Sequence, residues 1–137
     1  MEITHQADYA LRAILYLAKL EPGQRVPTSQ IAQETHIPPS FLTKIVSQLS
    51  IAGLIHTSRG ARGGVWLARQ PGEISLLDVL EAIDGSVILN QCVHDPEGCQ
   101  MAKECTLHLF WQDACGALVA RLRNTSFKDL TEPAAVL

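Results

Sequence analysis

Residues 39–68 read PSFLTKIVSQLSIAGLIHTSRGARGGVWLA, and this stretch decides the fold that we expect. Pro39 suits the first turn of a helix, and Gly53 is its expected C-terminal stop. Between them, apolar residues recur at helical spacing: Phe41, Leu42, Ile45, Leu49 and Ala52. The rest alternates as two short strands, near 54–55 and 65–67, around a glycine-rich turn. The stretch therefore predicts a helix followed by a β-hairpin wing.

The residues before this stretch predict two further helices. Apolar side chains recur at helical spacing behind Thr4, which can cap a first helix, and EPG at 21–23 ends it. Thr28 can cap a short second helix, SQIAQET, and HIPP at 36–39 forms the turn after it. Two short helices joined by a tight turn fit a helix-turn-helix. With the hairpin they predict a winged helix-turn-helix domain over residues 1–85.

Polar and basic side chains lie where such a domain contacts double-stranded DNA. Thr28 begins the second helix, and the expected recognition helix has a polar face made of Ser40, Thr43, Lys44, Ser47 and Gln48. Arg59 and Arg62 lie at the wing tip beside Gly60, where a guanidinium can enter a narrow minor groove. The alternatives are two packed helices without a ligand, or a winged helix that binds protein or RNA. The glycines are not a nucleotide-binding loop, because no Gly-Lys-Ser/Thr follows them.

Charge is distributed unevenly along the chain. Residues 1–70 carry seven Lys and Arg against four Asp and Glu, whereas residues 71–137 carry four against ten. The basic half can face a polyanion. The sequence shows neither a signal-peptide pattern nor an apolar run of ~20 residues, which predicts a cytoplasmic protein without a membrane segment. It also lacks a nucleophile–base motif, so we do not expect an enzyme.

The residues after the wing predict two longer helices and a tail. Ser75 can cap a helix over 76–85, and from about 103 to 123 a second apolar stripe is formed by Leu107, Phe110, Trp111, Ala114, Leu118 and Leu122. A helix this long reaches ~30 Å and outruns a small domain, so its stripe predicts a homodimer. Alternatively, the stripe covers its own domain. A short helix after Ser126 and a frayed tail, EPAAVL, complete the chain.

Three cysteines and a histidine lie between these two helices, in CVHDPEGCQMAKECTLH at 92–108. Six residues separate Cys92 from Cys99 and five separate Cys99 from Cys105, and a proline and a glycine keep the intervening chain turn-like. Thiolates gathered in this way suit zinc, an iron–sulfur cluster or reversible disulfide chemistry. His108 shares a face with Cys105 if both lie on one helical turn, and imidazole is an accepted ligand of 2Fe-2S centres.

The chain resembles the IscR and NsrR type of iron–sulfur winged-helix transcription regulators over almost its entire length. The resemblance rests on DYALRAILYLA (8–18), IPPSFLTKIVSQLSIAGLI (37–55), SRGARGGVWLA (58–68), ISLLDVLEAIDG (74–85) and the three cysteines ahead of a long helix ending in NTSFKDL. It implies a homodimer with crossed long helices and a cluster in the cysteine loop that controls DNA affinity. Arg59 would probe the minor groove, and Ser40, Thr43 and Lys44 would face the major groove or its phosphates.

Two departures from the family pattern are visible. The spacing between Cys92 and Cys99 is one residue longer than is commonest, and Pro38 stands where a capping serine is usual, so it cannot supply a hydroxyl cap.

The resemblance also implies two candidates for the fourth cluster ligand. Asp8 matches the position from which NsrR-type proteins supply a carboxylate of the partner subunit to a 4Fe-4S cluster, whereas His108 is similar to the IscR arrangement. We favour Asp8 and 4Fe-4S over His108 and 2Fe-2S. Otherwise Asp8 is a helix N-terminal charge favoured by the dipole, and His108 is an ordinary histidine. His94 and Cys115 are weaker candidates. Cys115 lies within the long helix, where a cysteine is typically a buried small apolar residue.

The sequence therefore predicts a mainly α fold with a small β-hairpin wing in three segments: the winged domain (1–85), a cluster-binding loop (86–105), and a dimerisation helix with its tail (106–137). We expect a homodimeric repressor that binds a palindromic operator. Its iron–sulfur cluster would sense nitric oxide, redox stress or iron status. The alternative is a zinc-bound or thiol-switch winged-helix regulator without such a cluster.

Overall fold

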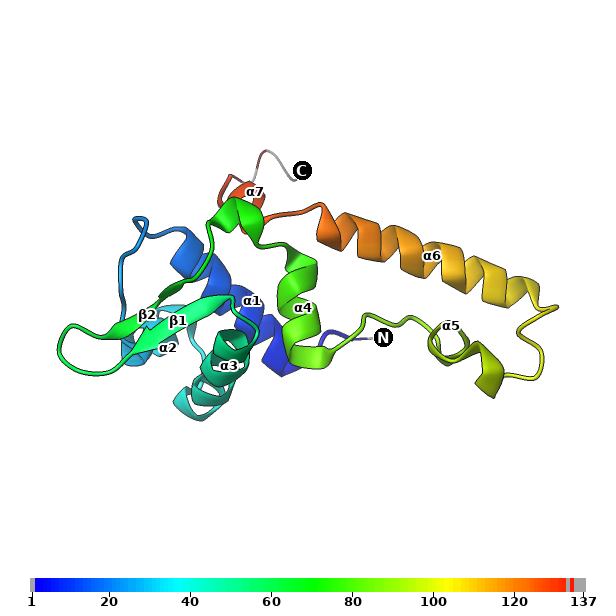
Figure 1. Ribbon diagram of the computed structural model, residues 1–137, viewed down its shortest axis with the longest axis horizontal. Helices are drawn as coiled ribbons and strands as arrows, with labels where there is room; N and C mark the ends of the chain where they lie inside the picture. The colour runs from blue at the N-terminus through cyan, green and yellow to red at the C-terminus, as the bar shows by residue number, and fades with distance from the viewer. Residues whose placement is uncertain (1, 133, 135–137) are drawn as a thin grey trace.

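The computed structural model describes residues 2–132 and residue 134. Met1, Pro133 and residues 135–137 lie outside the described residues, and with them most of the tail expected to be frayed. Figure 1 shows two regions: a head, made of residues 2–85 and 126–132, and an arm, made of residues 86–125, that extends from it. The fold is mainly helical with one two-stranded antiparallel hairpin, as predicted.

The head begins with two helices whose N-termini differ. Helix α1 (His5–Ala18) is capped by the Thr4 hydroxyl, which accepts a hydrogen bond from the Ala7 amide at 3.1 Å, as predicted. Helix α2 (Thr28–Thr35) starts at Thr28 itself, so the predicted capping role of Thr28 is wrong. The N-cap position belongs to Pro27, which has no side-chain hydrogen bond to offer. A left-handed residue, His36 with φ 56°, ends α2.

Helix α3 (Pro39–Ile51) is the predicted recognition helix and begins at Pro39, as expected. Its interior face buries Leu42, Ile45 and Leu49. Two residues assigned to that face are instead exposed. Phe41 is 45% exposed because it lies on the first turn, where its contact with Tyr9 is edge-on at a 5.6 Å centroid distance. Ala52 is the C-cap residue and lies beyond the core.

The wing is formed by β1 (Ile55–Ser58) and β2 (Gly64–Leu67), which pair antiparallel with Ile55 opposite Leu67. A short 3-10 turn, η1 (Pro71–Glu73), leads to helix α4 (Leu76–Asp84). Ser75 caps α4 through a reciprocal capping box with Asp78, which confirms its predicted role.

Helix α7 (Phe127–Thr131) follows the arm in sequence but packs in the head. The backbone of Ser126 bridges that of Ser75, and the Phe127 amide donates to the Ile74 carbonyl at 3.0 Å. Phe127 is fully buried in the same core as α1 and α3. The division of the chain at residue 85 stays a prediction. The core of the head, however, includes Phe127, which follows the arm in sequence. Its other fully buried members include Ile14, Ile31, Leu42, Ile45, Leu54 and Ile74.

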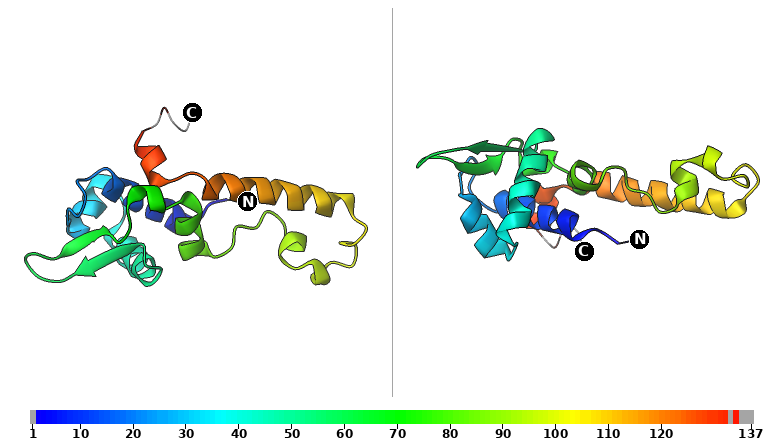
Figure 2. Two further views of the ribbon diagram at one scale, coloured as in Figure 1. Left: turned by 45° about the horizontal axis from the view of Figure 1, so that its top comes forward. Right: turned by 90° about the horizontal axis from the view of Figure 1, so that it is seen from below.

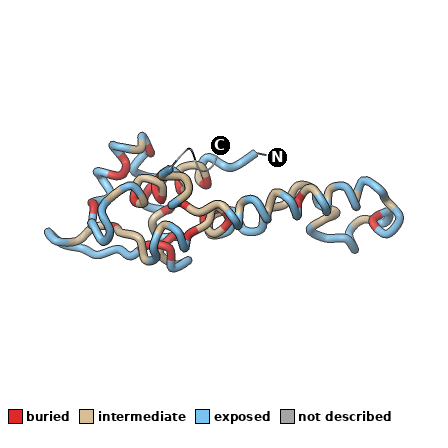
Figure 3. The backbone as a smooth tube through the Cα atoms, turned by 90° about the horizontal axis from the view of Figure 1, so that it is seen from above, coloured by how far each residue is buried: buried red, intermediate tan, exposed pale blue. Residues whose placement is uncertain are grey.

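The arm contains a one-turn helix α5 (Gln91–His94), a 3-10 turn η2 (Pro96–Gly98) and helix α6 (Thr106–Arg123). The two views of Figure 2 show α6 running beside the cysteine segment. The helix begins at Thr106, three residues later than predicted, because the chain before it forms turns. Figure 3 shows that buried residues concentrate in the head. Of the described arm residues, only Ala102 and Cys115 are buried.

Candidate nucleic-acid interface and cysteine site

A groove of about 660 Å³ separates the recognition helix α3 from the wing. Five of the residues predicted to contact DNA line it: Thr28, Thr43, Ser47, Arg59 and Gly60. They come from three elements, since α2 supplies the first, α3 the next two and the hairpin turn the last two. The fold thus gathers side chains that are spread over more than thirty residues of sequence into one polar and basic surface.

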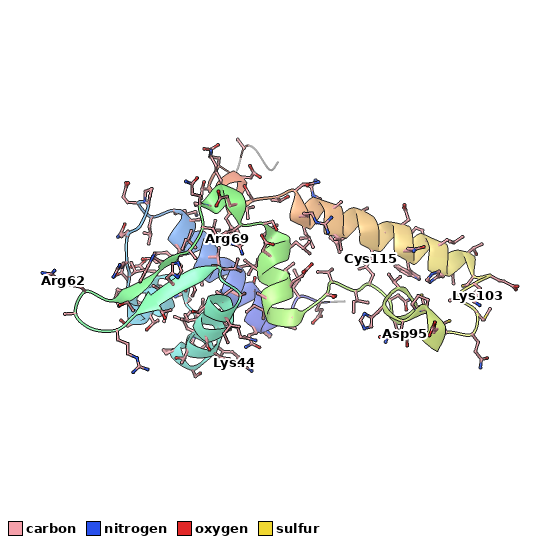
Figure 4. The ribbon with its side chains drawn as sticks, in the orientation of Figure 1. Lys44, Arg62, Arg69, Asp95, Lys103 and Cys115 are labelled. Atoms are coloured by element: carbon pink, nitrogen blue, oxygen red, sulfur yellow. The ribbon has the colours of Figure 1, made fainter. Side chains whose placement is uncertain are left out.

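The remaining predicted DNA contacts do not line this groove. Ser40 and Lys44 are exposed on α3, and Figure 4 shows Lys44 on that helix and Arg62 at the tip of the hairpin. Gln48 is different, because its side chain is half-buried and its oxygen accepts a hydrogen bond from Gln6 at 3.0 Å. Its amide group is thus already engaged with α1, so a contact between Gln48 and a base would require that hydrogen bond to be released or shared.

Both helices of the helix-turn-helix lack a side-chain cap at their N-termini. Pro27 and Pro38 occupy the N-cap positions of α2 and α3, and neither makes a capping hydrogen bond. The expectation that Pro38 supplies no cap is therefore confirmed. Backbone amides in a first helical turn that no side chain satisfies are suited to accept phosphate oxygens. The missing caps are consistent with a polyanionic partner.

The turn between the strands brings backbone close to the groove because it is built from glycines. Gly60 has φ 98°, and the amide of Gly63 donates to the carbonyl of Gly60 at 3.0 Å. A Cβ atom at Gly63 would overlap the Ser58 carbonyl. Arg59 and Arg62 therefore lie on a short, tight turn whose glycines add no side chains beside them. Thr57 and Ser58 also line the groove, and they were not among the predicted DNA contacts. The alternation of apolar and polar side chains along β1 could have indicated them.

The three predicted ligand cysteines lie along the arm on three different local structures. Cys92 lies on α5, Cys99 ends η2, and Cys105 is the N-cap residue of α6. The expectation of a turn-like chain is right for residues 96–98, but Cys92 lies on a helical turn. All four cysteines are free thiols, and these three are half-buried. Among the described residues, no three His, Cys, Asp or Glu side chains are close enough together to hold a metal ion.

The two candidates for a fourth ligand have different surroundings. The Nδ1 atom of His108 is buried and has no hydrogen-bond partner among the described residues, and the His108 amide donates to the Cys105 carbonyl at 3.1 Å. A buried imidazole nitrogen without a partner is costly unless it binds something. Asp8 lies on α1 in the head, where it forms an ion pair with Arg12 at 2.7 Å. Both side chains of this pair are about half exposed.

Cys115 is buried, as predicted for a small apolar residue, and its thiol donates to the Val87 carbonyl at 3.4 Å. This contact ties α6 to the segment that leaves the head. The donor set of the arm, three half-buried free thiols and one orphaned imidazole nitrogen, fits the chemistry of a soft metal or an iron–sulfur centre.

Comparison with known proteins assigns the chain to a family. The profile of the Rrf2 family, described as iron-dependent transcriptional regulators, matches residues 3–133. The chain belongs to the Rrf2 family. The HTH-type transcriptional regulator IscR of Aliivibrio salmonicida is 34% identical to this Rrf2 protein over 130 residues, which cover 95% of this chain and 77% of that one.

Two solved structures place the Rrf2 protein among other regulators with this fold. CymR, the global cysteine regulator of B. subtilis, superposes with a TM-score of 0.79 at 26% identity, covering 96% of this chain and 97% of that one. The oxidized form of Staphylococcus aureus CymR superposes with a TM-score of 0.73 at 31% identity, covering 96% and 97%. The Rrf2 protein is therefore a DNA-binding transcriptional regulator and not an enzyme. None of its described helices is long and apolar enough to span a bilayer.

Proposed function

We propose that this Rrf2 protein is a homodimeric repressor whose affinity for a palindromic operator is set by an iron–sulfur cluster in the arm. The observation that carries the proposal is the set of three half-buried free thiols beside α6, those of Cys92, Cys99 and Cys105. These groups are separate from the groove between α3 and the wing. A regulator needs such a separation, since one site receives the signal and the other binds DNA.

DNA would be bound through the groove and its surroundings. Ser40, Thr43, Lys44 and Ser47 project from the recognition helix, where they can contact base edges and phosphates of the major groove. Thr28 lies at the uncapped start of α2 and lines the groove, where it would approach the phosphate backbone. Arg59 and Arg62, with Gly60 allowing close approach, would reach the adjacent minor groove.

The dimer would form through α6. Leu107, Leu109 and Phe110 are each more than half exposed at the end of the helix that lies far from the head. Several large apolar side chains exposed at one end of a helix mark an interaction site, and in a chain that reads palindromic DNA the simplest partner is a second copy. Two heads held by crossed α6 helices would present their recognition helices at a fixed separation.

Cys92, Cys99 and Cys105 would hold the cluster, which supplies a centre that nitric oxide, oxidants and iron shortage can modify or remove. We propose Asp8 of the partner subunit as the fourth ligand, together with a 4Fe-4S cluster. Because α1 lies in the head and the thiols lie in the arm, a contribution from Asp8 would link one head to the other subunit's arm. His108, with 2Fe-2S, is the second candidate, and its free Nδ1 favours it.

The cysteine loop would then set the geometry of the dimer. When its donors are held together, the segment 92–105 is fixed against α6, and Cys105 directly precedes that helix. A change in the loop would move α6 and alter the distance between the two recognition helices. Binding to two half-sites requires one separation, so a modest rotation changes DNA affinity strongly.

Anaerobic native mass spectrometry of the full chain tests the cluster and its ligands together. We expect Asp8→Ala to lose or shrink the cluster, with Arg12→Ala as the matched control, because it breaks the same ion pair but keeps the carboxylate. His108→Ala is compared with His94→Ala, which removes the weaker histidine candidate of the same loop, an exposed side chain. Mobility-shift assays on cluster-bound and cluster-free protein follow, and equal affinity of the two forms for every promoter sequence tried contradicts cluster control.

A thiol switch is the second candidate function, favoured by the comparable similarity to oxidized CymR. It needs no metal, and it is supported if Cys92 and Cys105 form a disulfide that changes DNA affinity in protein without iron. A zinc-bound regulator would use the same thiolates. Metal analysis and visible absorption separate it from a cluster protein, because zinc is colourless.

A further inference from the structure

The wing is joined to the head by a segment outside the hairpin. Val26, just before α2, pairs with Val65 of β2 through two backbone hydrogen bonds, of 3.1 and 2.7 Å. Gly64 permits this approach, since a Cβ atom there would lie 2.8 Å from the Val26 carbonyl oxygen. An isolated two-stranded hairpin is at best marginally stable in water, so the base of the wing depends on this third segment.

Arg25 extends the same anchor toward the wing tip. Its guanidinium carbon lies 4.0 Å from the centroid of the Trp66 ring on β2. Its Nη1 atom donates to the carbonyl oxygen of Arg62 at 3.4 Å, and Arg62 belongs to the tip turn. Trp66 also contacts His56 of β1, with the ring centroids 5.6 Å apart. One arginine outside the hairpin thus contacts both β2 and the tip, and through Trp66 it is linked to β1.

These two contacts require a guanidinium rather than any positive charge. A planar guanidinium can stack on an indole face and donate an N–H in its own plane at the same time, whereas an ammonium is a compact point charge. The contacts also engage Arg25 with the protein: its guanidinium carbon lies over the Trp66 ring, and Nη1 donates to the Arg62 carbonyl. Its geometry is that of a brace between the head and the tip.

We propose that Arg25 is a positioning residue for DNA recognition, which holds the wing at the angle that lets Arg59 enter the minor groove. It acts through Trp66 and the Arg62 carbonyl and not through a phosphate contact of its own. The inference rests on the proposed contact between Arg59 and DNA. It adds a residue that determines how well the tip is placed.

Limited digestion with trypsin tests the brace without DNA, because Arg59 and Arg62 are themselves cleavage sites. In Arg25→Ala we expect cleavage at the tip to accelerate about threefold or more, as local opening becomes easier. Arg25→Lys should do the same, since it keeps the charge but not the planar stack. Arg69→Ala is the matched control: it also removes one exposed arginine, from the end of β2 away from the tip (Figure 4), and should leave tip cleavage unchanged. An unchanged rate in Arg25→Ala overturns the proposal.

A double-mutant cycle on DNA tests the function of the brace. The probe is a duplex of roughly 30 base pairs, long enough for two half-sites, enriched from a random pool by the wild-type protein. We expect Arg25→Ala to weaken binding about tenfold. In the Arg59→Ala background the same substitution should have almost no further effect, because the side chain that it positions is absent.

The cycle separates the two proposals. If Arg59→Ala leaves binding unchanged, the proposed wing contact fails, and the inference about Arg25 fails with it. If Arg59→Ala weakens binding but the effect of Arg25→Ala is undiminished in that background, the wing contact stands and the positioning role is overturned. In the latter case, a salt dependence reduced by about one charge, and retained binding by Arg25→Lys, would identify Arg25 as an independent phosphate contact.

Discussion

The head and the arm of this protein are stabilised in different ways. The head buries a continuous set of apolar side chains contributed by four helices and the wing, and even its last helix, α7, adds Phe127 to that core. In the arm, only Ala102 and Cys115 are buried among the described residues, while Leu107, Leu109 and Phe110 are exposed. The head can therefore fold on its own contacts, whereas the described arm residues form no comparable core, so the proposed second subunit and cluster would be what stabilises the arm.

Truncation of one phenylalanine in each region should show the largest difference. Phe127→Ala removes a fully buried ring and should lower the free energy of unfolding of the head by about 3–5 kcal/mol. Phe110→Ala, in the arm, removes a ring that is 60% exposed and should change that free energy by less than about 0.5 kcal/mol in dilute protein. Urea denaturation followed by circular dichroism measures both values. Equal losses would mean that the arm has a core of its own.

The exposed surface of α6 should determine self-association. In the proposed dimer, replacing Leu107 and Phe110 together by Ser should raise the dissociation constant about tenfold or more, since burial of one such side chain contributes about 1.5–3 kcal/mol. Ile51→Ser is the control, because Ile51 is an 86% exposed apolar residue on α3 of the head. Sedimentation equilibrium gives the constants. A dimer weakened by the control alone would place the interface on the head.

Replacing one glycine in each region by alanine compares the head with the arm through the addition of a single methyl group. Gly64→Ala should destabilise the head by about 1–3 kcal/mol, because φ there is 142° and the added methyl meets the Val26 carbonyl. Gly116→Ala should stabilise α6 by up to about 1 kcal/mol, since a Cβ at that position has open space around it. Thermal unfolding of both variants checks the signs. Destabilisation by Gly116→Ala in the dimer only would show that the partner passes close to this glycine.

The smallest effect is expected where the arm rejoins the head. Hydrogen bonds from the Ser126 backbone and then its side chain hold the pKa of Asp129 below its usual 3.8. A pKa that is lower in the folded state contributes stability above the unfolded value, and this contribution is lost as the pH falls through the folded one. The free energy of unfolding should therefore decline below about pH 4, and Asp129→Asn should flatten that decline. An identical slope in the variant would exclude Asp129 as its source.

Much of the head could be predicted because its signals are local. Thr4 and Ser75 are short polar residues before apolar periodic stretches, and both cap helices in the structure. Errors arose where periodicity was extended to helix ends. Phe41 and Ala52 match the spacing of the buried face, but the first and last turns of α3 reach past the core. Sequence alone could not show whether Thr28 is the N-cap residue of α2 or the first residue of the helix, which it is in the structure.

The candidate sites were predictable in composition more than in geometry. Helical spacing predicted a common face for Thr43 and Ser47, and the glycine-rich hairpin pattern predicted Arg59 at the wing tip; in the structure all three line one groove. The engagement of Gln48 by Gln6 joins residues on two helices that are far apart in sequence, so no local pattern could indicate it. The same holds for Arg25, whose partners Trp66 and Arg62 are brought to it only by the fold. Residue types indicate the candidate cysteine site, whereas the proposed fourth ligand, Asp8 of a partner subunit, would depend on assembly.

The arm is an insertion into the head, because the backbone bridge between Ser75 and Ser126 returns the chain to the head at the start of α4. A protease that cuts the exposed cysteine segment would therefore leave a nicked protein and not a released domain. The fragment that carries Phe127 would stay bound to the other by the core that it completes. If the chain is produced as two separate fragments, divided within residues 95–104, the two fragments should accordingly reassociate into the folded head.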